Sequence, residues 1–177
     1  MLTRAIYATF GAAAAAAALL AAISCGEHRA TGIEPPPAAA NSSSPTLVEC
    51  PTNQTQSNFA LVGVMGGTVQ VGGTSITIPG GALLSPTLIT VTVPSGQYLE
   101  VDVQANQLTS FLFQKPVSIT IDYSRCNRAN IESTPLTVWH IDPITKSLIE
   151  NMGGTDDKAS QSVTFTTGHL SGYAVAN

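Results

Sequence analysis

The sequence predicts an all-β protein, an antiparallel β-sandwich, and three observations lead to this prediction. From Phe59 onward, short segments alternate apolar and polar residues with a period of two, which is the repeat of a half-buried strand. Gly, Pro and Asn interrupt these segments at intervals of about 8 to 12 residues, as a sandwich requires. Thr, Val, Gly and Ser are abundant while only 10% of the residues are charged. We therefore expect one β-sandwich domain over residues 59–177.

The chain begins with a segment typical of an export signal. Arg4 precedes about 19 uncharged residues that end at Ile23, a length close to that of a membrane-spanning helix, so an uncleaved anchor is the alternative. Ser24-Cys25 favours cleavage, because a small residue before a cysteine resembles the bacterial lipobox. We expect residues 1–24 to be a lipoprotein signal peptide and Cys25 to carry the lipid, palmitate or a related acyl chain.

Residues 25–58 are expected to form a flexible tether. They are rich in Pro, Ala, Ser, Thr and Asn and show no apolar periodicity. The run Pro35-Pro36-Pro37 favours a locally extended chain.

The strands of the predicted sandwich follow from the alternation. In the clearest segment, Val117, Ile119, Ile121 and Tyr123 share one face, which must be buried. The other buried faces are expected to carry Ile89, Val91 and Val93, then Leu99, Val101 and Val103, then Val163 and Phe165. The expected strands are Ala60–Met65, Thr68–Val71, Thr74–Ile78, Thr87–Val93, Tyr98–Gln104, Leu108–Phe113, Val117–Tyr123, Leu136–Asp142, Ser147–Glu150, Ser162–Thr167 and Gly172–Ala176.

The glycines between Gly66 and Leu83 indicate turns between strands. Gly72-Gly73 predicts a tight hairpin turn, and Pro79 is expected to end the following strand. A phosphate-binding loop is excluded, because such a loop needs Gly-Lys-Ser/Thr at the start of a helix and this stretch has no Lys.

Charge and cysteine content limit the partners. After loss of residues 1–24 the chain has six Lys and Arg against eleven Asp and Glu, without a basic cluster, which argues against nucleic acid and against a basic patch for anionic lipid. With Cys25 assigned to lipid, Cys50 and Cys126 remain. An even pair in an oxidising compartment favours a disulfide over two free thiols.

Several motifs together resemble the ZU-five domain, a β-rich module of zonula occludens proteins, netrin receptors, ankyrins and many bacterial surface lipoproteins. The motifs are the run from Gly66 to Leu83, the segments Lys115–Ile121 and Leu136–Ile141, and the closing run Thr167–Val175. The resemblance covers most of residues 59–177 and implies a sandwich that serves as a binding or structural module.

The resemblance also implies one chemical hypothesis. In some relatives a His-Phe-Ser segment cleaves itself when the Ser hydroxyl attacks the preceding carbonyl. Here the segment is His169-Leu170-Ser171, in which Leu replaces Phe, and cleavage would release only Ser171–Asn177. Such chemistry needs a base and a strained turn. The alternative places His169 and Ser171 on an ordinary last strand.

No metal or cofactor is expected. His140 and Asp142 share a strand face, but two ligands do not make a metal site, and Asp142 is better explained by a turn. The acidic stretch Gly153–Asp157 suits weak Ca²⁺ binding, although a solvated loop explains it more simply. Trp139 is expected to pack in the core or at a sheet edge.

The sequence thus predicts a bacterial lipoprotein held outside the cytoplasmic membrane, with Gly26 after the cysteine favouring the outer membrane or cell surface. Its expected role is non-catalytic binding of another envelope protein or a glycan, through loops or an edge strand. The alternative is a hydrolytic or self-processing protein that uses His169, Ser171 or His140.

Overall fold

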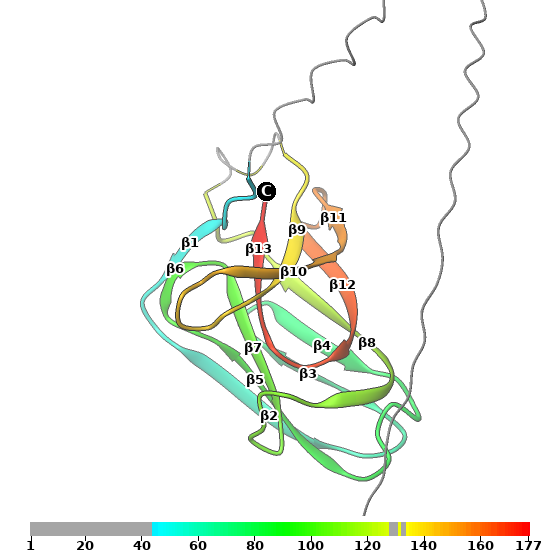
Figure 1. Cartoon of the computed structure of the whole chain (residues 1–177). Helices are drawn as coiled ribbons and strands as arrows, with labels where there is room; N and C mark the ends of the chain where they lie inside the picture. Colours follow the sequence, from blue (N-terminus) through cyan, green and yellow to red (C-terminus); the bar gives the residue numbers. More distant parts are fainter. Residues whose placement is uncertain (1–43, 128–130, 132–133) are drawn as a thin grey trace, which may run out of the picture. The chain divides into compact units, whose positions relative to one another are not determined.

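The secondary structure is entirely β in the part of the chain that our computed structural model describes, which is residues 44–127, 131 and 134–177 (Figure 1). The strands are β1 (Glu49–Thr52), β2 (Gln56–Val62), β3 (Gly67–Val71), β4 (Thr74–Ile78), β5 (Thr87–Val93), β6 (Gly96–Tyr98), β7 (Glu100–Ala105), β8 (Leu112–Asp122), β9 (Thr137–Ile141), β10 (Leu148–Gly153), β11 (Thr155–Asp157), β12 (Ser162–His169) and β13 (Gly172–Ala176). Within these residues there is no helix that is long and apolar enough to cross a membrane.

Two antiparallel sheets form the layers of a β-sandwich, which confirms the predicted fold class (Figure 1). One sheet has six strands in the order β10-β9-β13-β7-β5-β2, and the other has five in the order β11-β12-β8-β4-β3. A third, two-stranded sheet pairs β1 with β6.

The core lies between the inner faces of the two sheets, where strand alternation places the apolar residues. Val117, Ile119 and Ile121 of β8 are fully buried, and Ser118 and Thr120 between them are only partly covered. The facing sheet contributes Ile89 and Val91 of β5 to the same core. The predicted inner faces are therefore confirmed, because the residues on them are buried while most of their neighbours stay partly exposed.

The predicted hairpin at Gly72-Gly73 is confirmed. Both glycines have positive φ angles, 54° and 80°, and Val71 pairs with Thr74 across the turn. A two-residue turn with both φ angles positive matches the right-handed twist of the flanking strands, which explains why glycine occupies both positions.

The chain passes from one sheet to the other at both sides of the sandwich, and this leaves little free edge. On one side the chain passes from β2 to β3 through Gly66, whose φ is 82°. A larger residue is excluded there, because an added Cβ would lie 2.2 Å from the carbonyl oxygen of Ile78. There the Asn58 side-chain amide donates a hydrogen bond to the Gln70 carbonyl across the two edge strands. On the other side β10 continues into the three-residue β11 through Gly153 and Gly154.

The expected end of the tether at residue 58 is wrong. β1 and the start of β2 belong to the folded unit, which spans Ser43–Asn177. Thr46 and Asn177 exchange two backbone hydrogen bonds, and the Val48 amide donates to the Val175 carbonyl. The segment shows no apolar alternation because it does not need a continuous apolar face. Long-range backbone hydrogen bonds and the disulfide at Cys50 hold it in place.

Some strand boundaries also differ from the prediction. The expected strand Leu108–Phe113 does not exist as such, since Leu108 closes a turn with Ala105 and Leu112 already begins β8. β8 continues through Pro116, which a central strand normally excludes because proline cannot donate to the ladder. Here the pairing of β8 with β12 is irregular between Leu112 and Val117, so Pro116 does not have to donate a regular ladder hydrogen bond to β12.

Candidate functional site

Of the predicted modification sites, the structure tests only the cysteine pair. Cys25, the signal peptide 1–24 and the tether before residue 44 lie outside the described residues. Cys50 of β1 and Cys126, which follows β8, form a disulfide across 76 residues of sequence, with their Cα atoms 4.8 Å apart. Both half-cystines are buried, and the Arg125 guanidinium donates to the Cys50 carbonyl. The disulfide therefore attaches β1 to the end of the central strand β8.

His169 is the last residue of β12, and Leu170 and Ser171 connect it to β13, at a corner where the chain changes sheets. The alternative that placed both residues on the last strand is therefore wrong, since His169 ends the strand before it and Ser171 precedes β13. The Leu170 side chain is buried, and its amide donates to the Phe111 carbonyl. Neither Leu170 nor Ser171 has a positive φ angle, so the backbone strain that peptide self-cleavage requires has no support in this turn.

Tyr173 holds this corner. Its hydroxyl donates a 2.5 Å hydrogen bond to the His169 carbonyl, and the Thr167 hydroxyl donates to the same oxygen. A tyrosine at the start of a strand that bonds back to the preceding turn is the tyrosine corner of Greek-key sandwiches. Burial raises the pKa of Tyr173 to about 12, with the nearby Glu150 carboxylate adding to the shift and the Thr167 hydrogen bond opposing it. The expected strand Gly172–Ala176 includes Tyr173, but its alternation does not reveal this bond.

Two histidines meet beside the corner, although they lie 29 positions apart in the sequence. The ring centroids of His140 on β9 and His169 on β12 are 5.7 Å apart, and both rings lie near Tyr173. The Nε2 atom of His169 lies 3.8 Å from a carboxylate oxygen of Glu150 on β10. This cluster bridges the two sheets.

The surroundings of His140 disfavour its charged form. Burial lowers the pKa of His140, the positive charge of protonated His169 lowers it further, and Glu150 opposes the shift. At neutral pH His140 is therefore an uncharged ring in a partly buried site. In the described residues no group of three or more His, Cys, Asp or Glu side chains has a geometry that could hold a metal ion.

The Asp142 carboxylate stabilises the turn between β9 and β10, as predicted. One carboxylate oxygen accepts hydrogen bonds from the backbone amides of Ile144 and Thr145, at 2.9 and 2.7 Å. These bonds keep the pKa of Asp142 below its ordinary value. The carboxylate is thus committed to the β9–β10 turn, and it does not join the two histidines.

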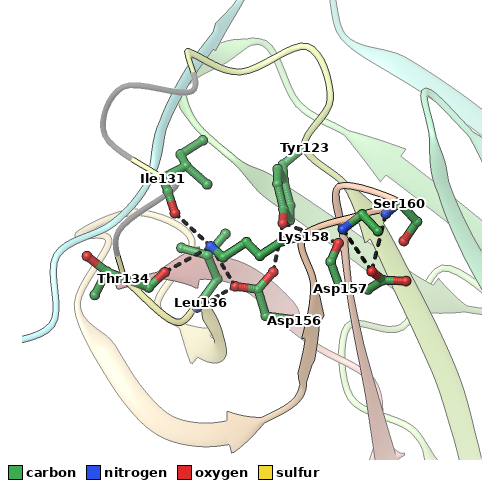
Figure 2. A network of polar contacts seen from close by, with 9 residues as sticks. Tyr123, Ile131, Thr134, Leu136, Asp156, Asp157, Lys158 and Ser160 are labelled. Carbon is green, nitrogen blue, oxygen red and sulfur yellow. Dashed lines mark hydrogen bonds and ion pairs between the residues drawn. The ribbon is translucent and has the colours of Figure 1, made fainter.

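The acidic stretch Gly153–Asp157 is the centre of a polar network that the sequence did not predict (Figure 2). The Asp156 carboxylate accepts from the Tyr123 hydroxyl, the Leu136 amide and the Lys158 ammonium, at 2.7, 2.9 and 2.8 Å. Burial disfavours its charge, yet these three donors outweigh burial, and the pKa of Asp156 is lowered.

Lys158 extends the network to the connection between β8 and β9. Its ammonium also donates to the carbonyls of Ile131 and Thr134, and it lies 5.8 Å from the centre of the Tyr123 ring (Figure 2). Asp157 accepts from the amides of Ala159 and Ser160 and thereby closes the next turn. Both aspartates thus hold turns together, which explains the stretch without Ca²⁺.

Trp139 lies on β9 and is half buried, with its indole nitrogen donating to the Thr137 hydroxyl on the same strand. It is therefore a packing residue of the six-stranded sheet outside the central core cluster.

Comparison of the sequence with models of known families and with curated proteins gave no match.

Proposed function

We propose that this protein is an extracytoplasmic lipoprotein, anchored through acyl chains on Cys25, whose β-sandwich acts as a non-catalytic binding or structural module of the cell envelope. The observation that carries the proposal is the buried Cys50–Cys126 disulfide. Structural disulfides form and persist in oxidising compartments outside the cytoplasm. The export leader and the disulfide therefore support the same compartment by independent routes.

The use of the charged side chains supports a non-catalytic role. Asp142 and Asp157 accept hydrogen bonds that close turns, Asp156 accepts from Leu136 before β9, and Glu100 of β7 pairs with Lys146 in the β9–β10 turn. A catalytic carboxylate needs a free oxygen facing a substrate. These four carboxylates instead contribute to the stability of the fold.

The loops rather than the sheet edges support binding of a partner. β-augmentation needs a free, straight edge strand. Here Asn58 links β2 to β3, and β11 has only three residues. The ZU-five resemblance belongs to the same proposal, since modules of that kind serve binding and scaffolding.

Metabolic labelling tests the anchor directly. Cells that express the chain are grown with a clickable palmitate analogue, and the protein is isolated from membrane and soluble fractions. We expect label on the native chain in the membrane fraction and no label on the Cys25→Ser variant. A Cys50→Ser/Cys126→Ser variant is the matched control and keeps its label. A native chain without label contradicts the proposal.

Intact-mass measurement separates the proposed role from self-processing. We expect one species that retains Asn177 and stays unchanged on incubation. Loss of the seven residues Ser171–Asn177, prevented by Ser171→Ala, would instead establish cleavage at the β12–β13 turn.

A further inference from the structure

Five exposed apolar side chains gather at one end of the sandwich. They belong to three loops and to the start of β8, and Met65 and Leu84 are 86% and 80% exposed. We call this group the apolar cap; its members are Val64, Met65, Leu84, Leu108 and Leu112.

Backbone hydrogen bonds between the loops place these residues together. The Gly81 amide donates to the Val64 carbonyl, which joins the β2–β3 turn to the β4–β5 loop. The Gln114 amide donates to the Ala82 carbonyl, which joins the same loop to the start of β8. The turn that carries Leu108 is attached to the start of β5 in the same way, through the hydrogen bond from the Asn106 amide to the Leu88 carbonyl.

The cap lies at the end opposite the chain termini of the folded unit. Val62 pairs with Thr87 at the cap end of the six-stranded sheet, whereas Ala176 pairs with Thr137 at the other end, beside Thr46. Figure 1 shows the C-terminus and β1 at one end, and the connection from β12 to β13 at the other. That connection belongs to the cap end, since His169 pairs with Leu112.

The loops that carry the cap contain no charged residue in a protein of net negative charge, although the Glu150 carboxylate lies 3.8 Å from His169, which pairs with Leu112. No Asp, Glu, Lys, Arg or His lies between Glu49 and Glu100, and none lies between Asp102 and Lys115. The nearest cation in the sequence, Lys115, donates to the Gly80 carbonyl at the base of the cap. A surface that must stay in water rarely combines several large apolar side chains with so few charges.

Two of the turns in the cap have an internal backbone hydrogen bond. The Gly66 amide donates to the Gly63 carbonyl, and the Leu108 amide donates to the Ala105 carbonyl. Backbone groups that enter a lipid phase need such internal partners, because no water replaces them there. The turns 63–66 and 105–108, which carry Val64, Met65 and Leu108, therefore keep these bonds on leaving water.

We propose that the apolar cap inserts into the interface of a lipid bilayer. The exposed side chains supply apolar area, and the cap loops themselves contribute no carboxylate that anionic headgroups would repel. With Lys115 as its one nearby cation in the sequence, the cap binds through apolar contact, so its affinity depends only weakly on lipid charge and on salt. The inference goes beyond the acyl anchor at Cys25 and does not require it.

Vesicle flotation tests the proposal on residues 43–177. Both sheets, the core and the disulfide lie within this compact unit, so it holds every contact needed to fold. We expect the unit to float with phosphatidylcholine vesicles and nearly equally with vesicles that also contain phosphatidylglycerol, at low and at high salt. Met65→Ser and Leu84→Ser each reduce partitioning about tenfold, since each removes the burial of one large apolar side chain.

Ile144→Ser is the matched control. Ile144 is 88% exposed, as apolar as the cap residues, and lies in the β9–β10 turn outside the cap. This variant keeps native partitioning, and thermal unfolding verifies that all variants are folded.

Three results overturn the proposal. The first is native protein that does not float, and the second is flotation that Ile144→Ser reduces as much as Met65→Ser does. The third is concentration-dependent self-association in light scattering, abolished by Met65→Ser, without flotation; it assigns the cap to a protein interface. None of these results depends on labelling of Cys25, so failure of the anchor and failure of the cap are distinguishable.

Discussion

Removal of the Cys50–Cys126 bond should destabilise the fold mainly through the unfolded chain. The bond closes a loop across 76 residues, for which the chain-entropy estimate is about 4.5 kcal/mol. Measured losses for native disulfides are about 2 to 5 kcal/mol, so we expect about 3 kcal/mol for Cys50→Ala/Cys126→Ala. The native state should persist, because both half-cystines belong to the core cluster but most of its members are strand residues between the two sheets.

Urea unfolding monitored by circular dichroism measures this loss. With a slope of about 2 kcal/mol per M, a loss of 3 kcal/mol lowers the midpoint by about 1.5 M. The slope itself should rise, because the unlinked chain exposes more surface on unfolding. Unfolding of the native sequence with and without reductant is the control, since reduction keeps both sulfur atoms and removes only the link. Equal midpoints with and without reductant, or two titratable thiols in the folded protein, would refute the reasoning.

Three further predictions concern the polar contacts. Asp156→Ala should lower the free energy of unfolding by about 2 to 3 kcal/mol in urea, because it removes three hydrogen bonds and leaves Lys158 without its carboxylate. Since the pKa of Asp156 is lowered in the folded protein, the stability that its carboxylate contributes should disappear as pH falls below about 4. Tyr173→Phe should lower the free energy of unfolding by about 1 kcal/mol through loss of the hydrogen bond to the His169 carbonyl. Between pH 10 and about 12 the tyrosine ionises in the unfolded chain but not in the folded one, so native stability should fall there, and Tyr173→Phe should remove this fall. The lowered pKa of His140 means that the unfolded chain binds its proton first, so native stability should fall as pH drops through about 6.5, and His140→Gln should flatten this slope in unfolding curves measured at several pH values.

Much of the sandwich could be predicted because its strands carry their own signal. Ile89 and Val91 of β5 and Ile119 and Ile121 of β8 alternate with polar residues, and burial on one face of a strand requires this period. The Gly72-Gly73 hairpin could be predicted for an equally local reason, since only a few residue types tolerate two successive positive φ angles.

Strands held by distant partners could not be predicted. β1 has no apolar face of its own, and its place depends on the bond from Cys50 to Cys126. The start of β2 is polar and exposed on an edge strand, so no alternation marks its true beginning at Gln56. Pro116 favoured a break, yet β8 tolerates it in an irregular part of the ladder.

By itself, the sequence determined the all-β class, the inner faces of the main strands and the pair of cysteines available for a disulfide, because each depends on local periodicity or on residue type. The packing of the two sheets brings His140 and His169 together, gives Asp156 three donors, and places the residues of the apolar cap at one end. Those contacts join residues from different strands and loops. A local sequence pattern does not show which distant residues become neighbours when strands pair and two sheets stack.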